Sequence, residues 1–215
     1  AGKRPKQFLE LAGTPILFHT LKAFEQCDVI QEIIVVIPPQ ESAGFLSLAN
    51  KFDLRKLARV IPGGTTRAQS VLHGLQAVRE ATAEVIAVHD GVRPFVTPDE
   101  IARTVDAASR EGAAILVTAP VDTIKEVRDG LVVKTLRRDE LRNALTPQCF
   151  HYKLLRRAYE ETDVTDPELT DESSLVERLG IKIAIVEGSS RNLKITREED
   201  LVVGEAILKQ MNLEL

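Results

Sequence analysis

Aromatic side chains and cysteines are scarce in this chain of 215 residues, and each shortage argues against a class of protein. There is no Trp, and aromatic residues make up only 4% of the sequence. Proteins that bind single-stranded nucleic acids stack bases on aromatic side chains, so such a platform is disfavoured. Cys27 and Cys149 are too few for a disulfide framework or a cysteine zinc site.

Several catalytic motifs are also absent. The chain has no Gly-x-Ser-x-Gly elbow, no His-Glu-x-x-His helix, no Walker A sequence and no Gly-x-Gly-x-x-Gly fingerprint. These absences argue against common hydrolases, P-loop enzymes and dinucleotide-dependent oxidoreductases. The net charge of -4 disfavours a nucleic-acid partner, although a local cationic pocket remains compatible with it. With no long apolar run and no signal-peptide pattern, we expect a soluble cytoplasmic protein without a membrane partner.

The stretch around which the chain is organised is residues 84–94, where an apolar run ends in charged residues. Residues 85–88 are continuously apolar, which is typical of a strand buried on both faces of a parallel sheet. His89, Asp90 and Arg93 follow directly. Because ligands bind beyond the carboxyl ends of strands in open α/β sheets, Asp90 stands where a divalent metal or a substrate would lie. An Asp and an Arg that simply begin a turn would give the same pattern.

Apolar strands alternate with amphipathic helices along the first 119 residues. The pattern predicts strands at 32–37, 58–61, 85–88 and 113–119, with helices at 14–25, 42–52, 67–78 and 97–112. This alternation predicts right-handed crossovers and a doubly wound, mostly parallel α/β sheet. Further on we expect a strand after Thr146-Pro147-Gln148, helices from 153 and from about 170, and a strand at 181–186.

Three positions carry helix-start signals. Thr14 is a candidate N-cap because Pro15 follows it. Thr97 with Glu100, and Thr196 with Glu199, have the spacing of a capping box.

Four candidate sites lie at strand ends or helix starts: Lys6, the Gly63–Gly64 turn, the Asp90 loop and Lys194. Glycines let backbone amides approach a ligand and a helix N-terminus favours anions, although a plain strand-to-helix turn would also explain Gly63–Gly64. A doubly wound sheet brings such sites to its carboxyl edge. One acidic ligand among several cations suits a phosphorylated ligand bound with Mg²⁺.

A hairpin interrupts the alternation. Residues 121–127 alternate in polarity, Asp129-Gly130 is a strong two-residue turn, and residues 131–136 return. The hairpin region, about residues 121–138, is either an arm that packs on a second subunit or an edge hairpin of its own sheet.

Seven motifs, in order along nearly the whole chain, resemble those of the 2-C-methyl-D-erythritol 4-phosphate cytidylyltransferase (IspD) family. They are Pro5-Lys6-Gln7, Gly63-Gly64 with Arg67 and Ser70-Val71, His89-Asp90 with Arg93-Pro94, Ala119-Pro120-Val121 with Asp122-Thr123, Ala144-Leu145-Thr146-Pro147-Gln148, Thr170-Asp171-Glu172, and Asn192-Leu193-Lys194-Ile195-Thr196.

The resemblance implies a nucleotidyltransferase reaction in non-mevalonate isoprenoid biosynthesis. The 4-phosphate of methylerythritol would attack the α-phosphorus of CTP and release pyrophosphate. A phosphate nucleophile is already anionic, so the reaction needs no general base, and positioning with charge stabilisation carries most of the rate.

The resemblance also implies a role for individual residues. Asp90 would hold Mg²⁺ on the triphosphate of CTP, and Lys6, Lys194 and Arg138 would be catalytic. The nucleotide side would comprise Gly64, Thr65, Ser70, Asp90 and Gly91, and the methylerythritol phosphate side Arg93, Thr123, Arg138, Thr146 and Lys194. Members of the family are homodimers with interlocking hairpin arms, so Thr123 and Arg138 would complete the partner's site.

Two other functions remain open at this point: a cytidylyltransferase for ribitol 5-phosphate or a similar polyol phosphate, and a non-catalytic nucleotide-binding scaffold. We expect residues 1–215 to form a single cytidylyltransferase domain, from a bacterium or from a plastid after removal of a transit peptide. The chain opens at Ala1 without an initiator Met. We therefore expect an upstream segment carrying the family's first strand and its Gly-x-Gly-x-Arg loop.

Overall fold

The main sheet of the computed structural model, which describes residues 5–81, 83–166 and 169–213, has four strands in the order β10-β6-β9-β5. The strands are β5 Val85–Val88, β6 Ala113–Thr118, β9 Asn143–His151 and β10 Ala184–Glu187. β10 pairs with β6 in parallel, whereas β9 pairs antiparallel with both β6 and β5. Three strands therefore run one way and β9 runs the other, which makes the sheet mixed.

Smaller sheets accompany the main one. β3 Ile33–Ile37 pairs in parallel with β4 Leu57–Pro62, and β1 Glu10–Leu11 pairs antiparallel with β2 Thr14–Pro15. A Gly-rich loop expected ahead of Pro5 lies outside the described residues.

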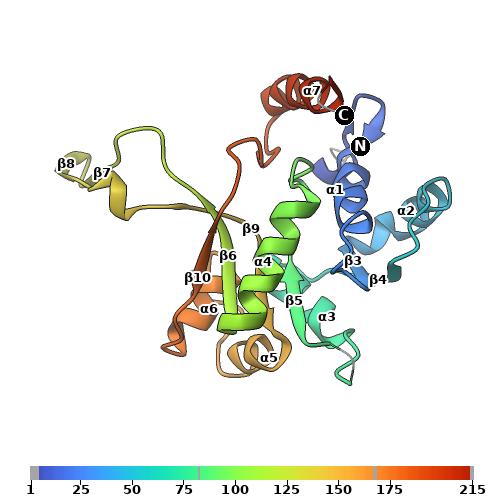
Figure 1. Cartoon of the computed structure of the whole chain (residues 1–215), viewed down its shortest axis with the longest axis horizontal. Helices are drawn as coiled ribbons and strands as arrows, with labels where there is room; N and C mark the ends of the chain where they lie inside the picture. The colour runs from blue at the N-terminus through green and yellow to red at the C-terminus, as the bar shows by residue number, and fades with distance from the viewer. Residues whose placement is uncertain (1–4, 82, 167–168, 214–215) are drawn as a thin grey trace.

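Helices follow the strands in the order that the sequence predicted (Figure 1). They are α1 Ile16–Glu25, α2 Ser42–Ala49, α3 Arg67–Gln76, α4 Pro98–Glu111, α5 Tyr152–Glu160, α6 Glu172–Arg178 and α7 Glu198–Leu213, with short 3-10 turns η1 Lys6–Phe8, η2 Pro39–Glu41 and η3 Arg138–Glu140. Among the described helices, none has the length and apolar character needed to cross a bilayer.

The two faces of the main sheet are covered by different helices. Ala114 and Cys149 form a buried cluster with alanines of α4. Their sequence neighbours Ala113 and Phe150 form another cluster with apolar side chains of α5 and α6. Because successive side chains of a strand point to opposite faces, α4 lies on one face and α5 with α6 on the other. The doubly wound α/β architecture is confirmed.

The predicted strand after Thr146-Pro147-Gln148 needs correction, because β9 already begins at Asn143. Gln148 pairs with Val88 of β5 and with Ile115 of β6. Thr146 and Gln148 are therefore buried inside the sheet rather than in a loop before it.

The helix-start predictions had different outcomes. The capping box of α4 is confirmed: Thr97 Oγ1 accepts from the Glu100 N–H at 3.2 Å, and the Glu100 carboxylate accepts from the Thr97 N–H at 2.9 Å. The Thr14 N-cap is wrong, because Thr14–Pro15 forms β2 and α1 begins at Ile16 without a side-chain cap. Pairing with β1 uses the backbone of Thr14 instead.

The predicted capping box of Thr196 and Glu199 is also wrong. Asp200 Oδ2 accepts from the backbone N–H groups of Thr196 at 2.7 Å and Arg197 at 2.8 Å, and from the Thr196 hydroxyl at 2.9 Å. A carboxylate that faces three donors forms stronger hydrogen bonds than a hydroxyl, so Asp200 holds the start of α7.

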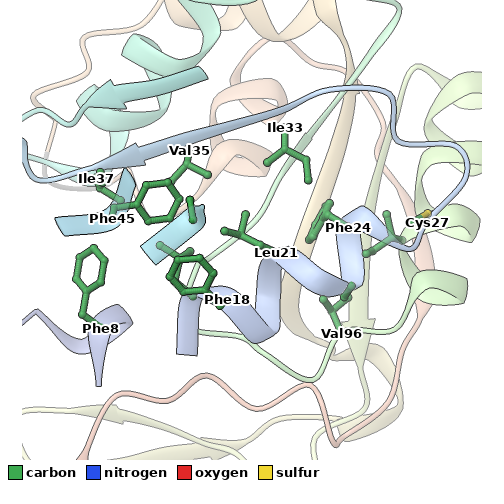
Figure 2. Close-up of a cluster of buried hydrophobic side chains, with 14 residues drawn as sticks. Phe8, Phe18, Leu21, Phe24, Cys27, Ile33, Val35, Ile37, Phe45 and Val96 are labelled. Atoms are coloured by element: carbon green, nitrogen blue, oxygen red, sulfur yellow. The ribbon is translucent and has the colours of Figure 1, made fainter. Parts of the chain in front are cut away.

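The N-terminal core lies between α1 and β3 (Figure 2). Phe18, Leu21 and Phe24 of α1 are buried against β3, and Phe18 stacks on Phe52 with 4.3 Å between ring centroids. Phe8 joins the same cluster and anchors η1. This packing fixes α1, whose Thr20 hydroxyl donates to the Gly91 carbonyl beside Asp90 at 3.2 Å.

The predicted hairpin is confirmed as β7 Lys125–Arg128 and β8 Leu131–Thr135. Asp129 and Gly130 both have positive φ, 51° and 77°, as a type I′ turn requires. Figure 1 shows the hairpin standing away from the main sheet. Its apolar side chains are exposed, including Leu131 at 73% and Val132 at 63%.

Candidate active site

Three cationic side chains converge on Asp90, which follows the carboxyl end of β5. Asp90 Oδ1 lies 3.3 Å from Arg67 Nε, and Asp90 Oδ2 lies 3.0 Å from Lys194 Nζ and 3.4 Å from Arg93 Nε. Arg67 begins α3 after the end of β4, and Lys194 follows the end of β10. Of the four predicted sites, the structure therefore brings three together at the carboxyl edge. They are the Asp90 loop, Lys194, and Arg67, which follows the Gly63–Gly64 turn.

The charges around Asp90 decide its protonation. Burial alone would raise the pKa of this carboxyl, but Arg67, Lys194 and Arg93 together lower it to about 2. Burial also lowers the pKa of Arg93, although Asp90 opposes that effect. At neutral pH the centre is an ionised carboxylate held among three cations.

His89 holds the Asp90 loop in place. Its Nε2 lies 3.1 Å from the Arg93 carbonyl, which can only accept, so this nitrogen carries the proton. Nδ1 then accepts from the Thr146 hydroxyl at 2.9 Å, and the same hydroxyl oxygen accepts from the Asp90 N–H at 3.2 Å. Burial lowers the pKa of His89 to about 4, so the ring is neutral at pH 7. His89 therefore links the loop to β9 through Thr146.

Asn192 and Ile195 attach the Lys194 segment to the same loop. The Ile195 N–H donates to the Val92 carbonyl at 2.9 Å. Asn192 Nδ2 donates to the Thr146 backbone carbonyl at 2.9 Å. The backbone carbonyl of Asn192 accepts from Arg93 Nη1 at 2.8 Å. Sequence patterns did not identify Asn192 as a positioning residue, because its partners are 46 and 99 residues away.

The Gly63–Gly64 turn packs closely against the first turn of α3. A Cβ at Gly64 would lie 2.5 Å from Gln69 Cβ, so no side chain fits there. The Gly64 N–H donates to Ser70 Oγ at 3.1 Å, and the Thr65 N–H donates to Gln69 Oε1 at 2.9 Å. A nucleotide oxygen that binds these amides has to replace Ser70 and Gln69 as the acceptors.

Lys6, Thr123 and Arg138 are the other predicted site residues that carry polar side chains on the surface. All three are exposed, and within the described residues no hydrogen bond or ion pair joins them to Asp90. Arg138, on η3 near the base of the hairpin, donates to the Val121 carbonyl at 2.5 Å. The hairpin β7–β8, which lies between Thr123 and Arg138 in the chain, projects from the main sheet (Figure 1).

A buried ion pair supports Arg67 from behind. Glu172, whose side chain is 1% exposed, accepts from Arg67 Nη1 at 2.7 Å and from Nη2 at 2.8 Å. Tyr159 of α5 donates its hydroxyl to Glu172 Oε1 at 3.1 Å. The sequence predicted a helix start near Thr170, and Asp171 does cap α6 by accepting from the Ser174 N–H at 3.0 Å. It did not predict the role of Glu172.

The donor set around Asp90 suits a metal that is bound mainly by its substrate. In the part of the chain that the structure describes, no three His, Cys, Asp or Glu side chains gather closely enough to hold an ion. Asp90 offers one carboxylate, and Mg²⁺ typically takes one or two carboxylates plus phosphate oxygens and waters. A cavity of about 470 Å³ between α3 and α5, lined by Leu75 and Tyr159, lies outside this cluster.

Sequence and structure comparisons agree on one family. Residues 1–210 match the family model described as "IspD: 2-C-methyl-D-erythritol 4-phosphate cytidylyltransferase". The 2-C-methyl-D-erythritol 4-phosphate cytidylyltransferase of Syntrophus aciditrophicus is 42% identical over 208 residues, covering 96% of this chain and 88% of the relative. That of Geobacter metallireducens is 43% identical over 209 residues, covering 95% and 90%.

Solved structures of the same family share the fold. The 4-diphosphocytidyl-2C-methyl-D-erythritol synthase of Anaerococcus prevotii superposes with a TM-score of 0.87 at 33% identity, covering 94% of this chain and 93% of the other. The Thermus thermophilus cytidylyltransferase superposes with a TM-score of 0.78 at 33% identity, covering 95% and 94%.

The family match over nearly the whole chain and the α/β fold shared with these enzymes make the chain a nucleotidyltransferase. The chain belongs to the 2-C-methyl-D-erythritol 4-phosphate cytidylyltransferase (IspD) family. Its activity is the CTP-dependent cytidylylation of methylerythritol phosphate in the non-mevalonate isoprenoid pathway.

Proposed function

We propose that the cluster of Asp90, Arg93 and Lys194 is the centre at which the cytidylyl group is transferred. The observation that carries this proposal is the convergence of Arg67, Arg93 and Lys194 within 3.4 Å of one carboxylate at the carboxyl edge of the sheet. Cations at such an edge attract and orient an anionic substrate, because ligands of open α/β sheets bind beyond the strand ends.

The reaction at this centre is an in-line displacement. A phosphate oxygen of the acceptor forms a bond to the α-phosphorus of CTP while the bond to the bridging oxygen breaks, and pyrophosphate leaves with the electron pair. No proton has to be removed from the nucleophile. Lys194, joined by Lys6, stabilises the negative charge that builds on the α-phosphate oxygens. The exposed position of Lys6 on η1 leaves its long side chain free to turn toward a bound triphosphate.

We propose Mg²⁺ as the cofactor, held by Asp90 and the triphosphate oxygens of CTP. When bound, the ion neutralises charge on the triphosphate and stabilises the leaving pyrophosphate. The ion pairs of Asp90 with three cations favour a metal that arrives with the nucleotide, because the triphosphate supplies the remaining negative charge.

The two substrates are assigned to opposite parts of this edge. Gly64, Thr65 and Ser70 would lie against the cytidine and ribose, joined by Gly91 next to Asp90. The Gly64 and Thr65 N–H groups support this assignment, because backbone amides can donate to the neutral oxygens of a ribose or a base. Arg93, Thr146 and Lys194 would contact the methylerythritol phosphate. Arg93 and Lys194 both face Asp90 Oδ2, whereas Arg67 of α3 faces Oδ1, and this supports the assignment.

We further propose that residues 1–215 form a single domain that acts as a homodimer through the hairpin arm at residues 121–138. One family model matching residues 1–210 supports the single domain. Exposed apolar side chains on the hairpin support a subunit contact, because burying them on a partner is favourable. Thr123 and Arg138 would then complete the acceptor site of the partner subunit. We expect the protein in the cytoplasm, where CTP is available.

Mixing two inactive variants tests this arrangement. Asp90→Asn disables the site in its own chain. Arg138→Ala, if the arm reaches across the dimer, disables the site of the partner subunit. If arms exchange between subunits, half of the mixed subunits form heterodimers with one intact site, and about a quarter of wild-type pyrophosphate release returns. If no activity returns after subunit exchange, Arg138 acts within its own chain or outside the site. Unmixed variants, carried through the same exchange step, are the controls.

A further inference from the structure

Glu172 is a charged residue in the interior of the protein that does not face the proposed substrates. Its side chain is 1% exposed at the first turn of α6. A buried carboxylate is costly unless other groups pair with it. Three hydrogen bonds offset that cost: two from the Arg67 guanidinium, at 2.7 and 2.8 Å, and one from the Tyr159 hydroxyl at 3.1 Å.

The geometry of Arg67 connects this buried carboxylate to the catalytic centre. Both terminal nitrogens of Arg67 point at Glu172, which leaves only Nε to face Asp90 Oδ1, at 3.3 Å. The guanidinium is planar and rigid, so the two bonds to Glu172 fix the direction of the third N–H. Arg67 therefore contacts one oxygen of Asp90 through Nε alone. Its forked end, Nη1 and Nη2, is bound to Glu172.

We propose that Glu172 is a positioning residue, which holds the forked end of Arg67 away from Asp90 and so keeps the Asp90 carboxylate available for metal-bound CTP. Among the described residues, Asp90 is the carboxylate besides Glu172 that contacts Arg67, so it is the anionic acceptor left for the freed N–H groups when the charge of Glu172 is removed. Arg67 would then bind Asp90 through two nitrogens and compete with the metal for its oxygens. This inference rests on the proposed role of Asp90 as the residue that holds the metal on CTP.

Glu172→Gln tests the inference, because it removes the charge and keeps the size of the side chain. We expect the MgCl₂ concentration for half-maximal pyrophosphate release to rise roughly tenfold or more, as for other residues that orient a metal ligand. Glu32→Gln is the matched control, since Glu32 forms a 2.7 Å ion pair with Arg79 on the surface. That control is expected to keep the wild-type dependence on MgCl₂.

Calorimetric titration with CTP gives a readout that does not depend on turnover. In wild type, MgCl₂ is expected to tighten CTP binding. In Glu172→Gln the metal-free affinity is expected to be kept or increased, because a negative charge has been removed, while the gain from MgCl₂ is lost. A general packing defect would weaken both titrations equally, and that result would overturn the inference.

A double-mutant cycle separates action through Arg67 from any other effect of Glu172. In an Arg67→Gln background there is no fork left to hold, so adding Glu172→Gln is expected to change the MgCl₂ dependence no further. Additive effects of the two substitutions would overturn the inference. Circular dichroism and thermal melting establish that each variant is folded before its kinetics are compared.

Tyr159→Phe keeps the inference testable if Glu172→Gln does not fold. It removes one hydrogen bond from Glu172 and is expected to raise the half-saturating MgCl₂ about threefold to tenfold. An unchanged value would overturn the inference. Asp90→Asn tests the underlying proposal separately: if it leaves the MgCl₂ dependence at the wild-type value, the metal role of Asp90 fails. If it abolishes that dependence while folded Glu172→Gln behaves as wild type, only the role of Glu172 fails.

Discussion

Replacing Asp90 with Asn should destabilise the folded protein as well as inactivate it. In the folded chain the pKa of Asp90 is about 2, against an ordinary value of 3.8. The difference corresponds to about 2 kcal/mol by which ionisation of Asp90 favours the folded state at pH 7. Solvent screens the ion pairs of Asp90 little, because its side chain is only 12% exposed. Asn has the shape of the protonated carboxyl, so Asp90→Asn should lose about this amount.

The stability lost in Asp90→Asn should be smaller at low pH than at neutral pH. Because the pKa of Asp90 is lower in the folded chain than in the unfolded chain, its ionisation stabilises the fold at pH values above about 4. The stabilisation disappears as the pH falls from about 4 toward 2. The difference in unfolding free energy between wild type and Asp90→Asn should therefore be constant from pH 7 to pH 5 and should narrow below pH 4.

Urea unfolding at a series of pH values, followed by circular dichroism, measures this difference. Asp106→Asn is the control, because Asp106 pairs with Arg110 on the exposed side of α4. Its loss should be about 0.5 kcal/mol or less. If Asp90→Asn is as stable as wild type at pH 7, the cost of burying Asp90 cancels the attraction of its three cations, and the ion pairs do not stabilise the fold.

Three further substitutions test other parts of the account. Lys194→Gln should lower kcat for pyrophosphate release by about 100-fold or more, because it removes a cation that stabilises negative charge on the α-phosphate. A loss below about tenfold would show that Lys194 is not part of the catalytic centre. Val132→Asp should shift the protein from dimer to monomer in sedimentation while circular dichroism shows a folded chain, since Val132 is 63% exposed in the single chain; a persistent dimer would exclude the hairpin as the contact. Gly64→Ala should cost about 1–3 kcal/mol in calorimetric stability, because its Cβ would lie 2.5 Å from that of Gln69. A wild-type melting temperature would show that the turn adjusts freely.

Regular elements could be predicted from the sequence because their side-chain periodicity is local. The apolar run of β5 and the capping box of α4 each lie within a few residues, and both elements were predicted correctly. The expected burial of β5 in a parallel sheet was wrong, because its first three residues are half-buried and its partner β9 is antiparallel. The position of Asp90 followed from the change of polarity after β5. The hairpin turn at Asp129-Gly130 followed from backbone conformations that few other dipeptides adopt easily.

Other features depend on contacts that no local pattern records. β9 runs antiparallel between β5 and β6, and this direction depends on how the chain returns from the hairpin. The pair of Arg67 and Glu172 joins residues 105 apart in the chain, each of which looks like an ordinary first-turn helix residue. At the start of α7, Asp200 replaced the predicted capping residue because its carboxylate reaches three donors.

Lys6, Thr123 and Arg138 show a different limit. Their predicted roles came from the family resemblance, and in the single chain they lie on the exposed surface, without described bonds to the Asp90 cluster. We propose that these roles require a second subunit or a bound nucleotide, and neither side-chain periodicity nor the fold of one chain supplies these.

The acceptor is established by measuring pyrophosphate release with CTP and MgCl₂ and comparing methylerythritol 4-phosphate with ribitol 5-phosphate. We expect release with methylerythritol 4-phosphate alone. Release with ribitol 5-phosphate alone would keep the cytidylyl transfer and contradict the isoprenoid substrate. A protein that binds CTP and releases pyrophosphate with neither acceptor would contradict the assignment of an active cytidylyltransferase.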